Sequence, residues 1–478
     1  WAGTNDGLVQ VSRDGGAIWT NVTDNIPNLA PLGTVRNIDA SRWEAGRAYI
    51  TVDFHEVGDF KPYVYKTDDF GANWRNITSG ISVSPLSFAR HILEDPVRPG
   101  LLYLGTENAM YISFNDGEKW QPFMTNMPAA PMYWIAVQEH FNDLVVGTYG
   151  RGIWIMDDIT PLQQLTADVM SASAHLFKPR PAYRFQPITE PMKMFDDQSD
   201  GDDPPAAASI NYWLREATED SVNIRIVNAI GNTVRTLPGT GKAGINRVWW
   251  NLWGEPTTQI KLRTKPQFAD WVELDEDRTR NALVGRITRL APPGTYTVLL
   301  EVAGQEYMQT LVVHKDPHSE GTESDIDAQM AMVRSLQEDM NTAADLVNRI
   351  ELVRRQIYDL KSLLKDRTDA GQIVGAVDLL DGKLIGVEEK MIQMKRSGTG
   401  QDVIRWPSML VSRIGYLAGA VAVADFPPTD QHQEGYQILK KRLQQYLDEL
   451  EHILQADIPA FNMLLQDNGL TSVITTMQ

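Results

Sequence analysis

Ser12-Arg13-Asp14-Gly15-Gly16-Ala17-Ile18-Trp19 is the first of three copies of one short motif. The second copy is Thr67-Asp68-Asp69-Phe70-Gly71-Ala72-Asn73-Trp74, and the third is Ser113-Phe114-Asn115-Asp116-Gly117-Glu118-Lys119-Trp120. The shared pattern is Ser or Thr, any residue, Asp or Asn, any residue, Gly, two residues and Trp. Its defining positions are Ser12, Asp14, Gly16 and Trp19, then Thr67, Asp69, Gly71 and Trp74, then Ser113, Asn115, Gly117 and Trp120. Three copies indicate a repeated structural unit.

The motif predicts a tight turn between two β-strands. Its hydroxyl and its carboxylate or amide oxygen accept hydrogen bonds from backbone N–H groups that the turn leaves unpaired. We expect the Gly to take a positive φ, which other residues resist. The Trp is expected to fold back over the turn and bury a large apolar area. These twelve residues are therefore interpreted as turn architecture.

The motif resembles the Asp-box, or BNR repeat, of sialidases, sortilin-type receptors and related β-propellers. Its copies start 55 and 46 residues apart (12 to 67 and 67 to 113), against about 40–45 residues for a four-stranded propeller blade. A fourth unit, 133–154, ends without the motif. The sequence predicts about four blades in residues 1–160, the first of them incomplete. Propellers close with about four to eight blades, so we expect missing N-terminal sequence of the same polypeptide or a protein partner to complete the ring.

The rest of the chain predicts three further regions, giving a multidomain protein that is mainly β and then α. Residues 161–207 are expected to form a linker with an acidic loop. Residues 208–315 alternate apolar and polar residues and predict an antiparallel sandwich, which resembles an immunoglobulin-like module. Residues 320–470 carry apolar residues at steps of three, four and seven, which predicts an antiparallel helical bundle whose apolar stripes form its core. The acidic start at Ser324 and Asp325 suits a helix N-terminus.

Composition excludes several classes of function. The formal net charge of −18 over 478 residues argues against nucleic acid or an anionic membrane as the main partner. The chain has no Cys, which excludes disulfides and thiolate metal sites. It has no apolar stretch long enough to predict a membrane-spanning helix. No motif for a phosphate loop, a nucleophile elbow or a zinc protease is present, and we expect no cofactor.

One acidic stretch is a weak metal candidate. Asp196 and Asp200 lie at spacings that resemble half of an EF-hand loop. Ala207 stands where the loop's twelfth-position Glu is required. A solvated loop is the interpretation that this pattern favours.

Chemistry, if present, is expected at the propeller axis on the face away from the Asp-boxes. The polar residues expected there are Asp53, His55, Glu56, Arg90, Glu107, Tyr149 and Arg151. Glycoside hydrolysis usually needs two facing carboxylates. In the structural alternative, Arg90 and Arg151 bridge neighbouring blades and Glu107 is their ion-pair partner.

The order of propeller, immunoglobulin-like module and helical tail resembles a large bacterial family described as sortilin-like, VPS10-like or BNR-repeat glycosyl hydrolase proteins. The most specific matches are residues 61–65, 104–107 and 150–158. The family has His where this chain has Tyr149, so no catalytic role carries over to that position. The resemblance implies an extracytoplasmic protein, in the periplasm, at the cell surface or secreted.

Two functions follow from these observations. The first is a non-catalytic binding or scaffold component of an envelope or extracellular assembly, with a glycan or peptide as ligand. The alternative is an extracellular glycoside hydrolase of sialidase or xyloglucanase-like type. The hydrolase name rests largely on the shared Asp-boxes, which transfer a fold better than an activity.

Overall fold

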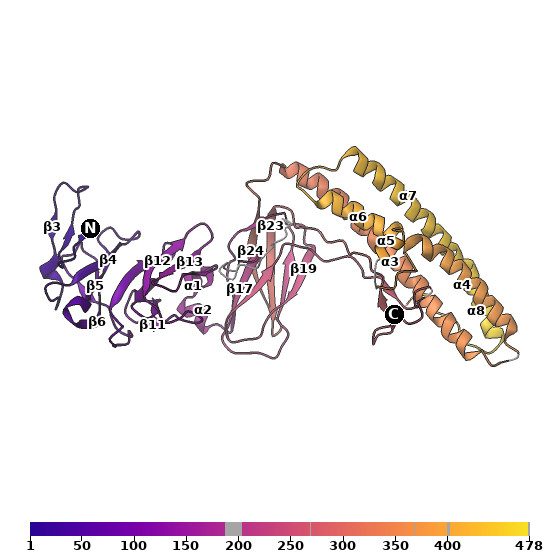
Figure 1. Cartoon of the computed structure of the whole chain (residues 1–478), viewed down its shortest axis with the longest axis horizontal. Helices are drawn as coiled ribbons and strands as arrows, with labels where there is room; N and C mark the ends of the chain where they lie inside the picture. Colours follow the sequence, from indigo (N-terminus) through magenta and orange to yellow (C-terminus); the bar gives the residue numbers. More distant parts are fainter. Residues whose placement is uncertain (187–202, 268, 368, 399–401, 477–478) are drawn as a thin grey trace.

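The computed structural model describes residues 1–186, 203–267, 269–367, 369–398 and 402–476, with the backbone alone at 402 and 403. The molecule is elongated, with small β-sheets at one end, two larger sheets in the middle and long helices at the other end (Figure 1). The chain is therefore β-rich first and helical afterwards, as the sequence predicts.

Four small antiparallel sheets, here called the repeat region, form the N-terminal part. The first sheet has the order β1-β2-β3, with β1 at Ala2–Gly3, β2 at Val9–Val11 and β3 at Thr20–Asn21. The second has the order β4-β5-β6-β7, at Thr34–Ala40, Ala48–Phe54, Asp59–Thr67 and Arg75–Asn76. The third has the order β8-β9-β10-β11, at Ala89–Glu94, Leu102–Thr106, Met110–Ser113 and Gln121–Pro122. The fourth has the order β12-β13-β14, at Met132–Gln138, Asp143–Thr148 and Ile153–Met156.

The three turn motifs have the same hydrogen bonds. The hydroxyl at the first position accepts the N–H of the motif Gly at 2.8 Å in the first copy and 3.0 Å in the other two. The Asp or Asn oxygen accepts the N–H four residues later. Each motif Gly has a positive φ, namely 96°, 83° and 78°. Trp74 and Trp120 are buried as expected, but Trp19 is 45% exposed.

Successive sheets pack against one another through their apolar faces. The core between the second and third sheets includes Val64, Ile92 and Leu104. The side chains of β4 also satisfy the free edge of β8: Asn37 Oδ1 accepts the N–H of Ile92 at 2.8 Å, and Asp39 Oδ2 accepts that of Glu94 at 2.6 Å. Polar residues on the edge strand of one sheet therefore pair the backbone of the edge strand of the next.

Two short helices and a two-sheet sandwich follow the repeat region. Helices α1 and α2 span Thr160–Gln164 and Ala167–Ser171. One sheet has the order β15-β17-β20, at Ala174–Leu176, Ala208–Leu214 and Gly244–Trp250. The other has the order β16-β24-β23-β18-β19, at Ala182–Arg184, Gln305–Lys315, Gly294–Val302, Asn223–Val227 and Thr233–Pro238. The segment predicted as a linker thus supplies one strand to each sheet, and β16 pairs with β24 in parallel.

Buried polar contacts join the sandwich to the regions before and after it. Asp158, fully buried, accepts hydrogen bonds from Ser209 and Asn211. Arg247 donates to the carbonyl of Asp158 at 2.6 Å. On the other side, Arg184 forms a fully buried ion pair with Asp425. Each junction is therefore a specific buried network rather than a loose tether.

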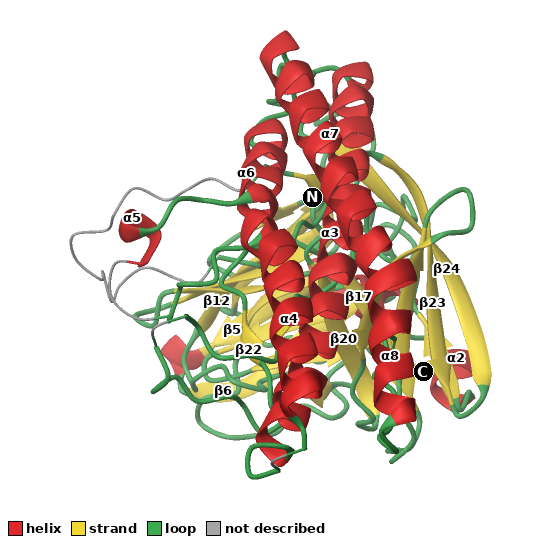
Figure 2. Ribbon diagram, turned by 90° about the vertical axis from the view of Figure 1, so that its right-hand side faces the viewer, coloured by secondary structure: helices red, strands yellow, loops and turns green. Residues whose placement is uncertain are grey.

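Long helices build the C-terminal region. They are α3 at Glu323–Leu363, α4 at Gly371–Met391, α5 at Asp402–Arg405, α6 at Leu410–Ala422, α7 at Asp430–His452 and α8 at Ile458–Asp467, with a π turn at Ile453–Asp457. Helices α3, α4, α6, α7 and α8 lie beside one another (Figure 2). Helix α3 begins one residue earlier than Ser324, because Thr322 is its N-cap and forms a capping box with Asp325. None of the helices in the described ranges is long and apolar enough to cross a membrane.

An irregular segment, 251–293, runs from the sandwich onto the helices. It contains the short strands β21 (Lys261–Leu262) and β22 (Arg280–Asn281). Side chains of α3 hold its backbone: Asn348 accepts the N–H of Lys261, and Glu351 accepts that of Thr264 at 2.7 Å. Its Ile260 and Leu262 join the helical core. The sandwich predicted over 208–315 includes this segment, whose contacts with α3 no local pattern indicates.

Candidate functional site

A β-bulge recurs at the same place in β4, β8 and β12, the first strands of the second, third and fourth sheets. The register shifts between Val35 and Asn37, between Ala89 and His91, and between Met132 and Trp134. The residues left unpaired at these shifts are Arg36, Arg90 and Tyr133. Bulges commonly re-aim a side chain near a functional site. The repeat therefore points three equivalent side chains to the same end of the strands.

Each bulge residue contacts the residue that follows the paired position on the neighbouring strand. Arg36 Nε lies 2.9 Å from Asp53 Oδ2. Arg90 Nε lies 2.8 Å from Glu107 Oε2. In the fourth sheet an aromatic pair replaces the ion pair.

That aromatic pair is Tyr133 and Tyr149, whose ring centroids are 5.9 Å apart. The same bulge thus recurs in three sheets, and the side-chain pair beside it is an ion pair in two of them and an aromatic pair in the third.

Arg90 connects the three sheets. Its Nη1 lies 3.4 Å from Asp53 Oδ2 in the second sheet. Its guanidinium lies 5.1 Å from the ring centroid of Tyr133 in the fourth sheet and 4.6 Å from that of Phe88 in its own. These distances are within the range of a cation–π contact. We call Arg36, Asp53, Arg90, Glu107, Tyr133 and Tyr149 the bulge cluster.

His55 closes one side of the bulge cluster. Its Nδ1 lies 2.7 Å from Asp53 Oδ2, and its backbone N–H donates to Asp53 Oδ1 at 2.9 Å. Its ring stacks on Phe88 with an interplanar angle of 11°. Glu56 next to it is exposed and lies 3.7 Å from Arg36. The turn 55–57 therefore fixes both oxygens of Asp53.

Burial divides the bulge cluster into a charged base and an aromatic surface. The Asp53 side chain has no exposed area, and that of Arg90 is 9% exposed. Tyr133 is 47% and Tyr149 73% exposed. The two carboxylates form ion pairs with Arg36 and Arg90 in the buried part of the cluster, and the two tyrosine rings face solvent.

The structure brings most of the sequence candidates together. Asp53, His55, Arg90 and Glu107 share one hydrogen-bonded network, with Glu56 at its edge. Tyr149 joins through Tyr133. Arg151 lies beyond Tyr149, exposed in a turn with the positive-φ residues Gly150 and Gly152.

Sequence reasoning missed Arg36, Phe88 and Tyr133. Tyr133 looked like the start of an ordinary strand, and Arg36 and Phe88 carried no motif. A bulge has no sequence signature of its own, since it appears only when two strands are paired. The one signal that could have found these residues is their equal position in successive repeats.

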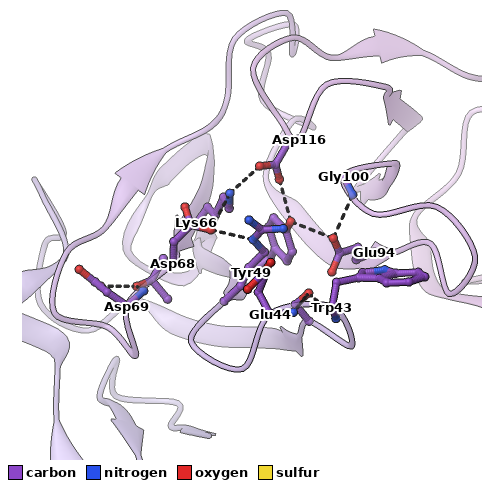
Figure 3. Close-up of polar contacts among 12 residues, drawn as sticks. Trp43, Glu44, Tyr49, Lys66, Asp68, Asp69, Glu94, Gly100 and Asp116 are labelled. Carbon is purple, nitrogen blue, oxygen red and sulfur yellow. Dashed lines mark hydrogen bonds and ion pairs between the residues drawn. The ribbon is translucent and has the colours of Figure 1, made fainter. Parts of the chain in front are cut away.

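A second polar cluster lies at the opposite ends of the same strands (Figure 3). The Lys66 side chain is 2% exposed and forms ion pairs with Asp116 and with Asp68, the latter at 2.8 Å. Tyr49 donates to Asp116 at 2.7 Å and approaches Glu94 at 3.3 Å. Lys66 and Tyr49 come from the second sheet, and Asp116 and Glu94 from the third. The cluster therefore fixes two neighbouring sheets together.

Burial shifts two titratable groups beside these contacts. Burial, together with the neighbouring Glu94 carboxylate, raises the pKa of Asp39 to about 6. Burial lowers the pKa of His91 to about 4. The His91 ring lies 4.4 Å from that of Trp134, and among the described residues its Nδ1 has no hydrogen-bond partner. His91 is therefore neutral above about pH 4, and Asp39 is protonated only below about pH 6.

The metal candidates Asp196 and Asp200 lie outside the described residues. Within the described ranges, no three His, Asp or Glu side chains are grouped so that they could hold a metal ion.

The chain matches no protein-family model and no curated protein. Among solved structures it is similar to the GH74 xyloglucanase from Xanthomonas campestris, with 14% identity over 66% of this chain and 40% of that one, at a TM-score of 0.26. The GH74 enzyme from Niastella koreensis gives 11% identity over 64% and 43%, at a TM-score of 0.25.

The extracellular domain of a hybrid two-component system from B. thetaiotaomicron gives 11% identity over 65% and 36%, at a TM-score of 0.23. The chain thus spans less than half the length of each of these structures. A likeness of this size says nothing of activity.

Proposed function

We propose that this chain is a non-catalytic binding component of an extracytoplasmic assembly. In this proposal the repeat region is part of a β-propeller, and the two-sheet sandwich is an immunoglobulin-like spacer. The bulge cluster is the ligand-binding surface. The ion pairs that hold the carboxylates of that cluster, and the exposure of its rings, support binding over catalysis.

The main support for this proposal is the burial and ion pairing of the two carboxylates. A general acid or a nucleophile must reach the substrate and change its protonation or bonding during the reaction. Asp53 has no exposed area and is held by Arg36, His55 and Arg90. Glu107 is 20% exposed and accepts from two nitrogens of Arg90 at 2.8 and 2.6 Å. Both carboxylates therefore act as fixed counter-ions that hold Arg90 in place.

The exposed rings define the ligand. Arg90 is fully engaged by Glu107, Asp53 and two rings, so it supports Tyr133 rather than offering a free cation. Exposed Tyr and Trp side chains are enriched where proteins bind partners, because they bury a large apolar area at low entropic cost. Tyr133 and Tyr149 fit an extended ligand with flat apolar faces, such as a glycan chain or a peptide.

Binding and hydrolysis can be measured on the same samples. Titration calorimetry with a panel of soluble β-glucan and xyloglucan oligosaccharides and a proline-rich peptide is expected to identify a binding probe. Tyr133→Ala and Tyr149→Ala should each weaken its binding by about tenfold, the usual effect of removing a partly buried aromatic contact. Tyr416→Ala is the matched control, since Tyr416 is 81% exposed on α6, far along the chain. Release of reducing ends from the same saccharides measures hydrolysis.

Equal binding by wild type and by both cluster variants would overturn the proposed surface. Turnover of any saccharide that Glu107→Gln abolishes would replace the proposal with the glycoside hydrolase alternative. Turnover unchanged in Glu107→Gln would place the chemistry outside the bulge cluster.

A further inference from the structure

A pocket lies between helix α6 and the irregular segment that follows the sandwich, and we call it the α6 pocket. Its volume is about 420 Å³, which is within the range of small-molecule sites. Residues 283–288 line it from the irregular segment. From the helix it is lined by small residues, namely Gly415, Ala418, Gly419 and Ala422. Because these residues have short side chains or none, they leave room for an apolar body beside α6.

The charged residues that line the α6 pocket are all cations. They are Arg286 and Arg396, and none of the described residues that line the pocket is Asp or Glu. The other polar residues of the lining carry hydroxyl groups, and they are Thr288, Ser408, Ser412 and Tyr416. The whole chain has 62 acidic and 44 basic residues, so the charge of this pocket is opposite to that of the molecule. The lining therefore has the charge of an anion-binding site.

Arg396 is buried without a carboxylate partner among the described residues. It is 5% exposed, and its Nη1 donates to the neutral carbonyl of Leu283 at 3.3 Å. Its Nε is buried and has no hydrogen-bond partner in the described part of the chain. Arg184 and Arg354 are as deeply buried, but each forms ion pairs with buried carboxylates. Since a buried charge without a counter-ion strongly destabilises a fold, the guanidinium of Arg396 indicates a place for an anion.

Arg286 adds a second cation at the exposed side of the α6 pocket. Its Nε and Nη2 donate to the carbonyls of Thr257 and Pro256, which hold the side chain in place without neutralising its charge. Ser408 and Ser412 supply hydroxyl donors from the other side. Helix α6 begins between these two serines, and the start of a helix favours negative charge. The positive groups of the pocket therefore come from both of its walls.

We propose that the α6 pocket binds an amphiphilic organic anion. Its carboxylate or phosphate head contacts Arg396 and Arg286, since a guanidinium binds both kinds of group through paired hydrogen bonds. Its apolar body lies along α6, beside Gly415, Ala418 and Gly419. The bound anion supplies the counter-ion that Arg396 lacks. This site belongs to the helical region, so the inference is independent of the function proposed for the repeat region.

The test is titration calorimetry of the full chain with decanoate and with decyl phosphate, each kept below the concentration at which it forms micelles. Wild type is expected to bind at least one of them, and the tighter of the two identifies the head group. Decanol has a similar body without the charge, and acetate has a carboxylate head without the body. Both should bind at least about tenfold more weakly than the preferred anion. Binding of neither amphiphilic anion, or equal binding of decanol, would overturn the proposal.

Filling the pocket tests where the apolar body lies. A side chain added at Gly419 starts in open space, because its Cβ would have no atom within 4 Å, so Gly419→Leu should occupy the pocket and leave the fold intact. It is expected to weaken binding of the preferred anion at least about tenfold. Gly382→Leu is the matched control, since Gly382 lies on α4, outside the pocket, and is equally open. The same affinity in both variants would show that the anion binds elsewhere and would overturn the proposal.

Removing the buried cation separates a binding role from a structural one. Arg396→Met keeps most of the side-chain volume, and it should weaken binding of the preferred anion at least about tenfold. The ligand-free variant should melt at a higher temperature than ligand-free wild type, because an unpaired buried charge has been removed. If Arg396 served only to hold the Leu283 carbonyl, the variant would melt at a lower temperature and bind the anion as wild type does. That result would overturn the proposal.

Discussion

The interface between the second and third sheets and that between the third and fourth use the same repeat positions with opposite chemistry. Lys66 and Ile112 are equivalent, since each pairs with a Tyr at the same register position of the preceding strand, Tyr49 and Tyr103. Lys66 forms an ion pair with Asp116 in the first interface, whereas Ile112 lies in the apolar core of the second.

At a second equivalent position, Asn37 pairs a backbone N–H of the next sheet, whereas His91 packs neutral against Trp134. Strand register sets the position of a side chain, and the residues of the neighbouring sheet determine whether a charged or an apolar side chain is stable there. Buried polar contacts can thus specify which sheets belong together.

The largest effect should come from moving the charge into the apolar interface. Ile112→Lys buries an ammonium group with no acceptor arranged for it, which we expect to lower the free energy of unfolding by on the order of 5 kcal/mol. Urea denaturation of the full chain measures it. Ile155→Lys is the matched control, because Ile155 pairs with Val145 at the strand position of the fourth sheet that Ile112 occupies, paired with Tyr103, in the third. Its cost should be close to zero, since Ile155 is 61% exposed. Equal losses in the two variants would contradict the equivalence of the two positions in different surroundings.

Removing the charge from the polar interface should cost less. Lys66→Ile leaves Asp116 and Asp68 without their buried cation and is expected to lose about 3 kcal/mol of unfolding free energy. Adding Asp116→Asn should recover part of that loss, so the double-mutant cycle gives a coupling of about 1 kcal/mol or more. Denaturation of the four proteins under one buffer provides the cycle. Strict additivity would show that Lys66 and Asp116 do not act as a pair.

The two interfaces should respond to pH in opposite directions. The pKa of His91 is lowered to about 4, so the unfolded chain gains a proton below about 6.5 that the folded chain refuses, and this contribution to stability is lost as pH falls from about 6.5 to 4. The pKa of Asp39 is raised to about 6, so the folded chain keeps a proton that the unfolded chain loses, and this contribution is lost as pH rises from about 4 to 6. Each pKa shift is about 2 units, which corresponds to about 3 kcal/mol of unfolding free energy. In wild type the two opposite dependences of unfolding free energy on pH largely cancel between pH 4 and 6.

Single substitutions should reveal the pH dependence of stability that each group contributes. In His91→Asn, which introduces the residue found at the equivalent Asn37, stability should fall as pH rises through this window. In Asp39→Asn it should fall as pH decreases. Thermal melts at half-unit steps of pH measure both, and two variants with parallel pH profiles would refute the assignment.

The smallest effect is expected at an exposed ion pair that links the second and fourth sheets. Arg42 and Glu139 form a two-fold hydrogen-bonded contact, at 2.9 and 2.5 Å, with both side chains more than half exposed. Solvent screens such pairs, so Arg42→Ala should leave the melting temperature unchanged within error at 0.15 M salt. A clear drop would mean that this contact, rather than the buried Lys66 cluster, ties the sheets together.

Local patterns made some of these features readable in advance. The turn motif depends on hydrogen bonds within eight residues, so its copies mark the repeat wherever they occur. The apolar stripe of α3 depends on a period of 3.6 residues, and its members Ile326, Val333, Leu336 and Met340 are all buried. The candidates Asp53, His55, Arg90 and Glu107 could be named because they are ionisable residues at the borders of apolar strand segments.

The remaining features depend on partners far away in the chain. The linker segment gave β15 and β16 because the sheets of the sandwich had open edges for them, which no local pattern records. Trp19 and Trp120 occupy the same motif position, yet only Trp120 is buried, since burial is a property of the neighbouring sheet.

The sequence by itself therefore determined the repeated turns, the order of β and helical regions and the polar residues at the strand ends. Only the tertiary structure decided that three bulges bring Arg36, Arg90 and Tyr133 to one place, and that Asp53 is buried beneath them. The reason is physical: turns and helices are stabilised by contacts within a few residues, whereas register and burial are set when distant strands pair and neighbouring sheets pack.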